Sequence, residues 1–371
     1  MSAANQTRPF RVVIACGGTG GHLFPGIAVA QEARRRGWET LLLISSKQID
    51  ALAVQGHDDL RFEKVPAVAM PSPLSPAMVK FLWRFWKTRR QCLELIRGFG
   101  ADAVLGMGGF TSLPPAMAGR KLGLRTFVHE SNAVPGKANR MTARFCDTVL
   151  LGLEACARHF PKARVRVTGT PLRSSLCDPV DAKEARATFG LRDDRQTILI
   201  MGGSQGARGV NKAVVAALPG LAAVADRVQV LHITGPGDAE TIAPEYAKFP
   251  GLTAHVAPFC QRMDLAYAVA DVAVSRSGAS SLTELSAFGV PTILVPYPFA
   301  ADDHQRRNAD VFTKEGAAIA VEEAEIGEGK LGGLLLELLG DAERRAGLAA
   351  AMRRLAPRDA AARVCDAIGE K

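Results

Sequence analysis

The chain has 371 residues, of which 47% are hydrophobic and 22% are charged. This length and composition are typical of a globular protein with two domains. The formal net charge of +9 suits an anionic partner, such as a nucleic acid, a phosphorylated substrate or an acidic membrane surface. We expect no nucleic acid, because the sequence has neither a lysine-rich tail nor an aromatic–basic RNA-binding motif.

The seven cysteines are scattered along the chain, and none forms a Cys-x-x-Cys pair. Their odd number and spacing predict reduced thiols in the cytoplasm, with no disulfide framework and no zinc site. The segment from Met1 to Phe10 is short and polar, so we expect no secretory signal. No apolar run reaches about 18 residues, so no segment is expected to span a bilayer.

Two glycine-rich turns, each between a short apolar run and a helical stretch, are the strongest signal. They lie within 11–22 and 197–208, and Gly17 and Gly202 are 185 residues apart (202 − 17). This repetition at half the chain length predicts two Rossmann-like domains facing across a cleft. The helix N-terminus after each turn suits a phosphate group. Neither turn has the dinucleotide fingerprint and no P-loop occurs, so NAD and ATP are disfavoured.

Apolar, β-branched runs alternate with helical stretches along almost the whole chain. The expected strands are 11–16, 40–45, 103–106, 125–128, 148–151, 165–167, 197–201, 228–233, 253–256, 272–274, 292–295 and 317–320. The expected helices include 24–36, 210–217 and 281–288, and the tail from Asp341. Continuous apolar runs are typical of parallel strands buried on both faces. The predicted fold class is therefore α/β, with a doubly wound parallel sheet in each domain and a junction near 169–171.

The segment 76–90 departs from this pattern. Ser75 can cap a helix whose first residue is Pro76, and apolar side chains cover more than half of the helix circumference. We interpret it as an interfacial membrane helix, partly buried and partly facing lipid. The alternative is a wide core helix between two layers. The residues expected at the membrane are Met78, Val79, Phe81, Leu82, Trp83, Phe85 and Trp86, with Lys80, Arg84 and Lys87 as a basic stripe.

Glycine-rich or polar segments follow two more strands of the first half. The turn 106–111 follows one of them and could bind a diphosphate together with the first turn. The sequence 129–132, His-Glu-Ser-Asn, follows the strand 125–128. Polar residues at the carboxyl end of a parallel strand point toward the ligand cleft. Taken alone, His129 or Glu130 is more typical of an ordinary loop residue.

In the second half, polar residues again follow the expected strands. Glu284 lies about two turns into a helix that opens at 277–278, and it could reach ribose hydroxyls. His304 and Gln305 could hydrogen-bond a sugar. Arg173, just past the junction, carries a guanidinium, the natural partner of a diphosphate. Because no Asp-x-Asp motif occurs, we expect neither a metal-held sugar nucleotide nor a cofactor.

Five motifs occur in order, namely Gly17-Gly-Thr-Gly-Gly-His22, Gly106-Met-Gly-Gly109, His129-Glu130-x-Asn132, Gly202-Gly-Ser-Gln-Gly-Ala-Arg208, and Arg276-Ser-Gly-Ala279 with Glu284. Together they resemble the MurG family of bacterial peptidoglycan glycosyltransferases, over about residues 11 to 320. The resemblance implies a GT-B fold and an inverting, metal-independent transfer of N-acetylglucosamine (GlcNAc) from UDP-GlcNAc. The implied acceptor is the C4 hydroxyl of N-acetylmuramic acid (MurNAc) in lipid I, undecaprenyl-pyrophosphoryl-MurNAc-pentapeptide, and the product is lipid II.

The resemblance also implies a division of labour between the domains. Residues 1–168, completed by a C-terminal helix at about 357–371, would bind the acceptor and the membrane. Residues 169–356 would bind UDP-GlcNAc. The expected location is the cytoplasmic face of the bacterial inner membrane, as a peripheral protein. The expected partners are UDP-GlcNAc, lipid I, the anionic membrane surface and other cell-wall synthesis proteins.

Site residues follow from matching the family's motifs to this sequence. The implied donor-binding residues are Thr19, Gly20, Gly21, Asn132, Arg173, Ser204, Gln205, Phe259, Met263, Arg276, Ala279, Ser280, Ser281, Glu284, His304 and Gln305. The implied acceptor-binding residues are Gly18, Gly108, Gly109, Phe110 and Asn139. His22 is the first candidate for the base that accepts the hydroxyl proton, followed by Glu130 and His129; alternatively, His22 only orients a diphosphate.

The chain departs from the family pattern at four positions. Phe110 stands where tyrosine is common and cannot donate a hydrogen bond, and Ser131, Thr170 and His304 also differ. Two other functions stay open. The first is another GT-B enzyme that uses UDP-GlcNAc, either a lipid-glycan transferase or a 2-epimerase. The second is a non-catalytic protein that binds lipid-linked precursors. The membrane-like helix disfavours an epimerase with a soluble substrate, and the intact donor loop with Glu284 disfavours a scaffold.

Overall fold

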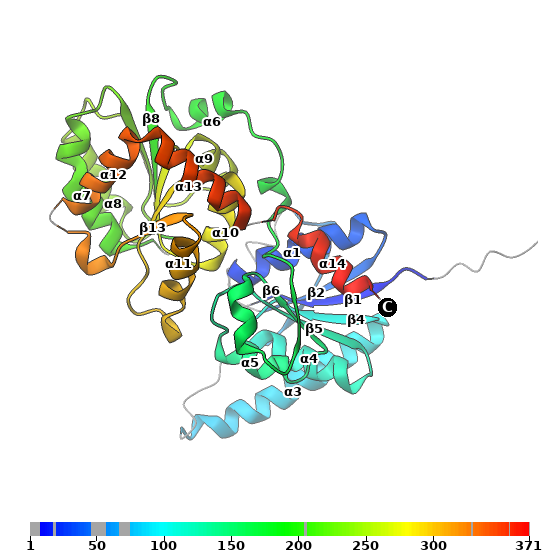
Figure 1. The fold of residues 1–371 in the computed structure, drawn as a ribbon. Coiled ribbons are helices and arrows are strands. Elements are labelled where there is room, and N and C mark those ends of the chain that lie inside the picture. The colour runs from blue at the N-terminus through cyan, green and yellow to red at the C-terminus, as the bar shows by residue number, and fades with distance from the viewer. Residues whose placement is uncertain are drawn as a thin grey trace, which may run out of the picture. The chain divides into compact units, whose positions relative to one another are not determined.

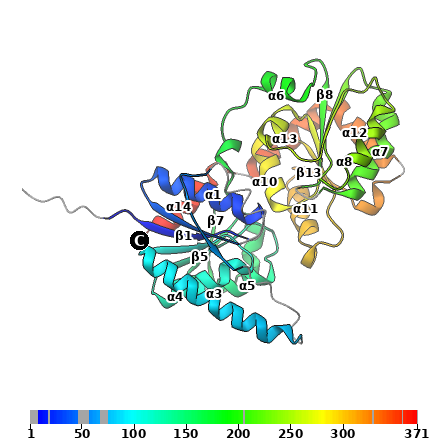
Figure 2. The same ribbon diagram turned by 180° about the vertical axis from the view of Figure 1, so that it is seen from behind.

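The computed structural model describes residues 8–17, 20–45, 57–66, 75–203, 206–327, 329–355 and 357–370. The chain divides into two compact units, Met1–Ser174 with Arg358–Lys371, and Ser175–Pro357. Figures 1 and 2 show that each unit is a sheet with helices on both of its faces. The predicted pair of doubly wound parallel α/β domains is therefore confirmed.

The first unit is built on a seven-stranded sheet in which all neighbouring strands are parallel. The strand order is β3-β2-β1-β4-β5-β6-β7, so the winding direction reverses between β1 and β4. Sheets of this kind bind ligands beyond the carboxyl ends of the strands at such a reversal. The strands are β1 (Arg11–Ala15), β2 (Glu39–Ser45), β3 (Arg61–Val65), β4 (Ala103–Gly106), β5 (Arg125–Glu130), β6 (Thr148–Leu151) and β7 (Arg164–Val167).

Helices cover both faces of this sheet, because side chains of each strand alternate between the faces. Val12 and Ile14 of β1 pack with α1 and α14, whereas Val13 and Ala15 pack with α3 and α4. The helices are α1 (Gly20–Arg35), α3 (Ala77–Phe99), α4 (Leu113–Lys121), α5 (Lys137–Ala143) and α14 (Ala360–Gly369), with short 3₁₀ turns η1 (Phe110–Ser112) and η2 (Glu154–His159). A third 3₁₀ turn, η3 (Ser174–Leu176), spans the boundary between the two units.

The helix predicted at 76–90 is the first part of α3. The Ser75 hydroxyl accepts a hydrogen bond from Ala77 N at 3.2 Å, and Pro76 has helical dihedral angles, as the sequence predicts. The helix continues nine residues beyond the predicted end, to Phe99. Among the described residues, no helix has both the length and the apolar character needed to cross a membrane.

The apolar residues of α3 do not share one environment. Phe85 is only 8% exposed, and together with Phe81 it packs against Leu113, Met117, Met141 and Phe145. The helical period turns Val79, Leu82, Trp83 and Trp86 outward instead, where they are exposed. Expecting Phe85 at the membrane surface was therefore wrong, because this side chain belongs to the core beneath α3.

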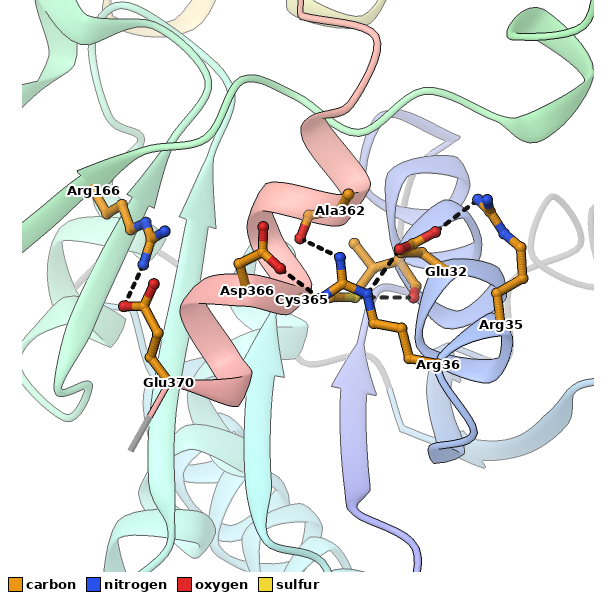
Figure 3. Close-up of polar contacts among 9 residues, drawn as sticks. Glu32, Arg35, Arg36, Arg166, Ala362, Cys365, Asp366 and Glu370 are labelled. Atoms are coloured by element: carbon orange, nitrogen blue, oxygen red, sulfur yellow. Dashed lines mark hydrogen bonds and ion pairs between the residues drawn. The ribbon is translucent and has the colours of Figure 1, made fainter.

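Helix α14 completes the core of the first unit from the far end of the sequence, as Figure 3 shows. Its apolar face buries Ile368 beside α1. Arg36, directly after α1, lies 2.6 Å from Asp366 Oδ1, and Arg166 of β7 lies 2.5 Å from Glu370 Oε2. The apolar face and the ion pairs thus fix this helix to α1 and to the sheet of the first unit.

The second unit has a six-stranded parallel sheet in the order β10-β9-β8-β11-β12-β13. Its strands are β8 (Gln196–Met201), β9 (Val228–Ile233), β10 (Ala254–Ala257), β11 (Val272–Ser275), β12 (Thr292–Leu294) and β13 (Ala318–Ala320). Its helices are α6 (Ala182–Phe189), α7 (Arg208–Ala222), α8 (Ala239–Ala247), α9 (Met263–Val269), α10 (Ala279–Phe288), α11 (His304–Lys314), α12 (Lys330–Gly340) and α13 (Ala342–Leu355), with η4 (Ala301–Asp303) and η5 (Glu323–Glu325). One buried cluster joins the sheet to α7, α8, α12 and α13.

Every predicted strand is present, with its ends within two residues of the predicted ones. The sequence did not predict β3, whose residues Arg-Phe-Glu-Lys-Val include three charges. Among the described strands, it lies at the edge of the sheet and pairs with β2 alone. An edge strand is partly solvated, so it lacks the continuous apolar run that identifies the central strands.

Candidate functional site

In the first unit, the two glycine-rich turns and His22 are brought together. The Thr111 hydroxyl donates a hydrogen bond to Gly17 O at 2.7 Å, joining the turn after β4 to the turn after β1. The imidazole of His22 lies against the second turn, where a Cβ at Gly108 would be 2.8 Å from His22 Nε2. Gly108 also has φ +120°, so this turn needs glycine both for its conformation and for the close approach of the ring. A Cβ at Gly109 would likewise be 3.3 Å from Cε1 of the same ring.

His129 lies at the end of β5 and is fully buried. Its Nε2 is 2.9 Å from the carbonyl oxygen of Gly169, and because a carbonyl only accepts, Nε2 carries the proton. The other ring nitrogen, Nδ1, accepts from the Ser131 hydroxyl at 3.4 Å. Burial lowers the pKa of His129 to about 4. The ring is therefore neutral near pH 7 and has both nitrogens engaged, which favours a structural role over a base role.

Glu130 is also buried, and its carboxylate accepts four hydrogen bonds. Oε1 accepts from the backbone N and the side-chain Nδ2 of Asn132, both at 2.9 Å. Oε2 accepts from Gly136 N at 3.2 Å and from Asn139 Nδ2 at 2.8 Å. Four bonds occupy the lone pairs of a carboxylate. Glu130 thus organises the loop after β5, and no lone pair is left for a substrate proton.

Asn139 connects this loop to the glycine-rich turns. It is 4% exposed, and its Nδ2 also donates to His129 O at 3.1 Å. The same Nδ2 would be 3.3 Å from a Cβ at Gly108. Asn139 Oδ1 has no hydrogen-bond partner among the described residues. Buried acceptors are usually satisfied, so this oxygen marks a place where a ligand hydroxyl or amide can donate.

The remaining first-unit predictions fall around the start of α1 and η1. Gly20 and Gly21 are the first two residues of α1, and Phe110 is half-buried at the start of η1. The guanidinium of Arg173 lies over the ring of Phe24 on α1, 4.6 Å from its centroid. Gly18 and Thr19 lie outside the described residues.

In the second unit, the predicted donor residues follow four strands of one sheet. Phe259 follows β10, the turn 202–207 follows β8, α10 follows β11, and α11 follows β12. Because the carboxyl ends of parallel strands share one edge, these segments lie along the same edge of the sheet. Phe259 is exposed, and Met263 is the first residue of α9. Ser204 and Gln205 lie outside the described residues.

Glu284 is held by a residue that the sequence did not predict. The hydroxyl of Tyr267, which is 2% exposed on α9, donates to Glu284 Oε2 at 2.7 Å. This contact fixes the direction of the carboxylate on α10. A buried tyrosine needs a partner for its hydroxyl. This requirement was the one signal in the sequence that could have pointed to Tyr267. The first turn of α10 consists of Ala279, Ser280 and Ser281.

Arg276 is buried and braces the loop after β12. Its Nη1 donates to the carbonyl oxygens of Val295 and Pro296, both at 3.1 Å, and its Nη2 is paired with the carboxylate of Glu323. The guanidinium also lies over the ring of Tyr297. These contacts favour an indirect role, in which Arg276 holds the loop after β12 in shape.

His304 and Gln305 open α11 after a strained turn. Asp302 and Asp303 have φ of 53° and 54°, a region that residues other than glycine rarely adopt. His304 Nδ1 donates to Ala301 O at 2.7 Å. Gln305 Oε1 accepts from Tyr297 N at 3.0 Å. The loop 296–305 is therefore closed on itself, and both predicted sugar-binding residues take part in holding it.

Comparison with known domain families gives a match in each half of the chain. The glycosyltransferase family 28 N-terminal domain matches residues 12–151, and the family 28 C-terminal domain matches residues 197–364. A relative from Geobacter sulfurreducens is named UDP-N-acetylglucosamine--N-acetylmuramyl-(pentapeptide) pyrophosphoryl-undecaprenol N-acetylglucosamine transferase. It is 38% identical over 358 residues, which cover 96% of this chain and 97% of the relative. A relative of the same name from Halothermothrix orenii is 34% identical and covers 93% and 94%.

Solved structures agree with this match. The crystal structure of MurG from Acinetobacter baumannii has a TM-score of 0.75 at 26% identity, covering 97% of this chain and 99% of that one. A UDP-GlcNAc 2-epimerase from Neisseria meningitidis has a TM-score of 0.70 at 13% identity and shares the fold alone. The family resemblance seen in the sequence motifs is thus confirmed: the chain belongs to glycosyltransferase family 28 and, within it, to the MurG family of GT-B glycosyltransferases.

Proposed function

We propose that this chain transfers GlcNAc from UDP-GlcNAc to the C4 hydroxyl of MurNAc in lipid I and thereby forms lipid II. The observation that carries the proposal is near full-length similarity to relatives named for this transfer. It is supported by the glycine-rich turn 106–111, which lies against His22 and is joined to Gly17 by the Thr111 hydroxyl. Such turns offer backbone N–H groups to the diphosphate of an acceptor, and the imidazole offers a base beside them.

The proposed reaction is a single displacement. The MurNAc O4 attacks C1 of GlcNAc and passes its proton to His22, while the bond between C1 and the UDP oxygen breaks on the opposite face. The configuration at C1 is inverted, and UDP leaves as an anion. The backbone N–H groups of the turn 202–207 and of the first turn of α10 stabilise this charge. Arg173 stays the predicted cation for the diphosphate, so the transfer needs no metal.

His129 and Glu130 are proposed to position the acceptor site rather than to transfer protons. Each has its polar atoms engaged by the protein. Together they hold Asn139 by its Nδ2. This leaves Asn139 Oδ1 to accept a hydrogen bond from the acceptor, and it leaves His22 as the proposed base.

Donor recognition is proposed to rest on the sheet edge of the second unit. Glu284, oriented by Tyr267, binds the ribose hydroxyls. Phe259 and Met263 contact the uridine. His304 and Gln305 bind the GlcNAc hydroxyls, and for these two the closed loop 296–305 provides the geometry.

The exposed face of α3 is proposed to bind the cytoplasmic face of the inner membrane. Its apolar members are Val79, Leu82, Trp83 and Trp86, and the cations Lys80, Arg84 and Lys87 are exposed on the same helix. Lys87 lies 5.4 Å from the centroid of the Trp83 ring, and Arg89 lies 5.1 Å from that of Trp86. Aromatic rings beside cations suit the headgroup region of an anionic bilayer.

One assay tests the transfer directly. Purified protein is incubated with labelled UDP-GlcNAc and a lipid I analogue, with and without EDTA, and the products are separated. We expect labelled lipid II analogue and UDP in equal amounts in both conditions. Conversion of UDP-GlcNAc to its C2 epimer without acceptor would favour the epimerase alternative. Binding of both substrates without turnover would favour the non-catalytic alternative, and dependence on a metal would refute the metal-free mechanism.

A further inference from the structure

A buried chain of hydrogen bonds lies behind the glycine-rich turn of the second unit. Tyr246 OH on α8 is 2.9 Å from His232 Nδ1 on β9, and His232 Nε2 is 3.1 Å from Asn211 Oδ1 on α7. Asn211 Nδ2 continues to Asp238 Oδ2 at 2.8 Å. Asp238 Oδ1 then lies 3.3 Å from Arg208 Nε. His232 and Asn211 are at most 1% exposed.

In this series of hydrogen bonds, the donors and acceptors can be assigned in only one way. The Asp238 carboxylate and the Thr234 carbonyl, 2.9 Å away, can only accept, so both bond to the amide nitrogen of Asn211. Its Oδ1 therefore faces His232, and His232 Nε2 must carry the proton. Nδ1 is then an acceptor, and the Tyr246 hydroxyl donates to it. Burial lowers the pKa of His232 to about 4, so the ring stays neutral near pH 7.

These hydrogen bonds lead to Gly206, Ala207 and Arg208, where the glycine-rich turn ends and α7 begins. Arg208 is the first residue of α7, and Asn211 N donates to Ala207 O at 2.8 Å. On the other side, the Thr234 oxygen that accepts from Asn211 would be 2.3 Å from a Cβ at Gly206. Gly206 also has φ +76°. Gly206 therefore lies close against the Thr234 carbonyl, and Asn211 holds that carbonyl by a hydrogen bond.

A glycine-rich turn has few side chains of its own to hold it in one conformation. Binding of an anion by backbone N–H groups requires that these groups already point at the ligand. We propose that Tyr246, His232 and Asn211 are positioning residues that hold Gly206 and Ala207, the described end of this turn, in the conformation that binds the donor's diphosphate. This inference rests on the proposed function, because it assumes that the turn binds UDP-GlcNAc.

The test separates this role from a contribution to stability alone. Tyr246→Phe removes one hydroxyl and leaves His232 Nδ1 without its donor, while the ring of residue 246 stays in the core. Asn211→Ala breaks the chain at its centre. The matched control is Val214→Ala, which removes buried apolar contacts from α7, the helix of Asn211, and leaves all of these hydrogen bonds intact. For each protein, the Kd of UDP, the KM values of UDP-GlcNAc and of the acceptor, kcat and Tm are measured.

We expect Tyr246→Phe to raise the Kd of UDP and the KM of UDP-GlcNAc by about 3- to 10-fold, the effect of one neutral hydrogen bond. Asn211→Ala should raise both further, and in each case the KM of the acceptor should stay within about twofold of wild type. Val214→Ala should lower Tm at least as much as Tyr246→Phe and leave the donor constants within about twofold.

Two results would overturn the inference. In the first, Tyr246→Phe and Asn211→Ala lower Tm but leave the affinity for UDP unchanged. In the second, Val214→Ala weakens donor binding as much as they do. Both results leave the proposed function standing, provided that the wild-type protein binds UDP and transfers GlcNAc. A wild-type protein that does neither would refute the proposed function itself.

Discussion

The exposed face of α3 permits a paired test of membrane binding. Trp83 and Trp86 are 65% and 53% exposed. If a fully exposed tryptophan has about 200 Å² of surface, the two side chains together expose roughly 240 Å². Immersing half of this area in lipid, at about 25 cal/mol per Å², contributes about 3 kcal/mol to membrane binding. Changing both to Ser should therefore weaken binding to anionic vesicles about 100-fold. Sedimentation with phosphatidylglycerol vesicles, at low and high salt, measures this.

The companion variant changes Phe81 and Phe85 to Ser on the buried side of the same helix. Truncating a buried phenylalanine costs about 3–5 kcal/mol, so this variant should lower Tm sharply. The tryptophan variant should keep its Tm, and it should keep its activity on a short, soluble acceptor while losing activity on a long-chain one. If the tryptophan variant still binds vesicles, or loses activity on both acceptors equally, the exposed face of α3 is not the membrane site.

Three further predictions concern the two sites. His22→Ala should lower kcat by about 10²–10⁴-fold. Glu130→Gln should mainly lower Tm, because one carboxylate oxygen is replaced by an amide group that faces hydrogen-bond donors. A Glu130→Gln variant that keeps its Tm but has no activity would instead identify Glu130 as the base. Glu284→Ala should weaken UDP binding by about 1.5–3 kcal/mol, and Tyr267→Phe by less than that, in calorimetric titrations; unchanged affinity in both would remove the pair from the donor site. The folded-state pKa of His129, about 4, lies below its ordinary value of about 6.5. Between these two pH values the unfolded chain binds more protons than the folded one. The free energy of unfolding therefore falls as the pH drops through this window, by up to about 3 kcal/mol. Urea unfolding from pH 7 to pH 4 should show a shallower fall for His129→Gln than for wild type, and equal slopes would contradict this.

The architecture of both units was predictable because the central strands are continuous apolar runs. Such runs require burial on both faces, and each is followed by a turn or helix whose glycines mark a tight connection. The edge strand β3 escaped prediction because its charged residues are compatible with solvent on one side. The sequence also did not show which apolar side chains of α3 face the core. A helical wheel gives the angular order of residues but not the direction of the core.

The candidate sites were predictable in their location and less so in their chemistry. His22, Gly108 and Gly109 lie in the segments that follow β1 and β4, which are neighbours in the parallel sheet, so strand order alone predicts their proximity. The saturated carboxylate of Glu130 depends on partners six and nine residues away, and the buried ring of His129 depends on Gly169, 40 residues away. Sequence spacing does not show whether a titratable group is free or fully bonded. The contact between Tyr267 and Glu284 likewise depends on how α9 and α10 pack.

The position of α14 has a consequence for biosynthesis. Residues 360–369 belong to the core of the first unit but follow the whole second unit in the sequence. Domains usually fold in order as they leave the ribosome, the N-terminal one first. Here α14 is synthesised after the whole second unit, so the face of β1 and α1 that it covers stays open while the rest of the chain is made. The first unit must therefore keep this apolar surface from aggregating until α14 has left the ribosome.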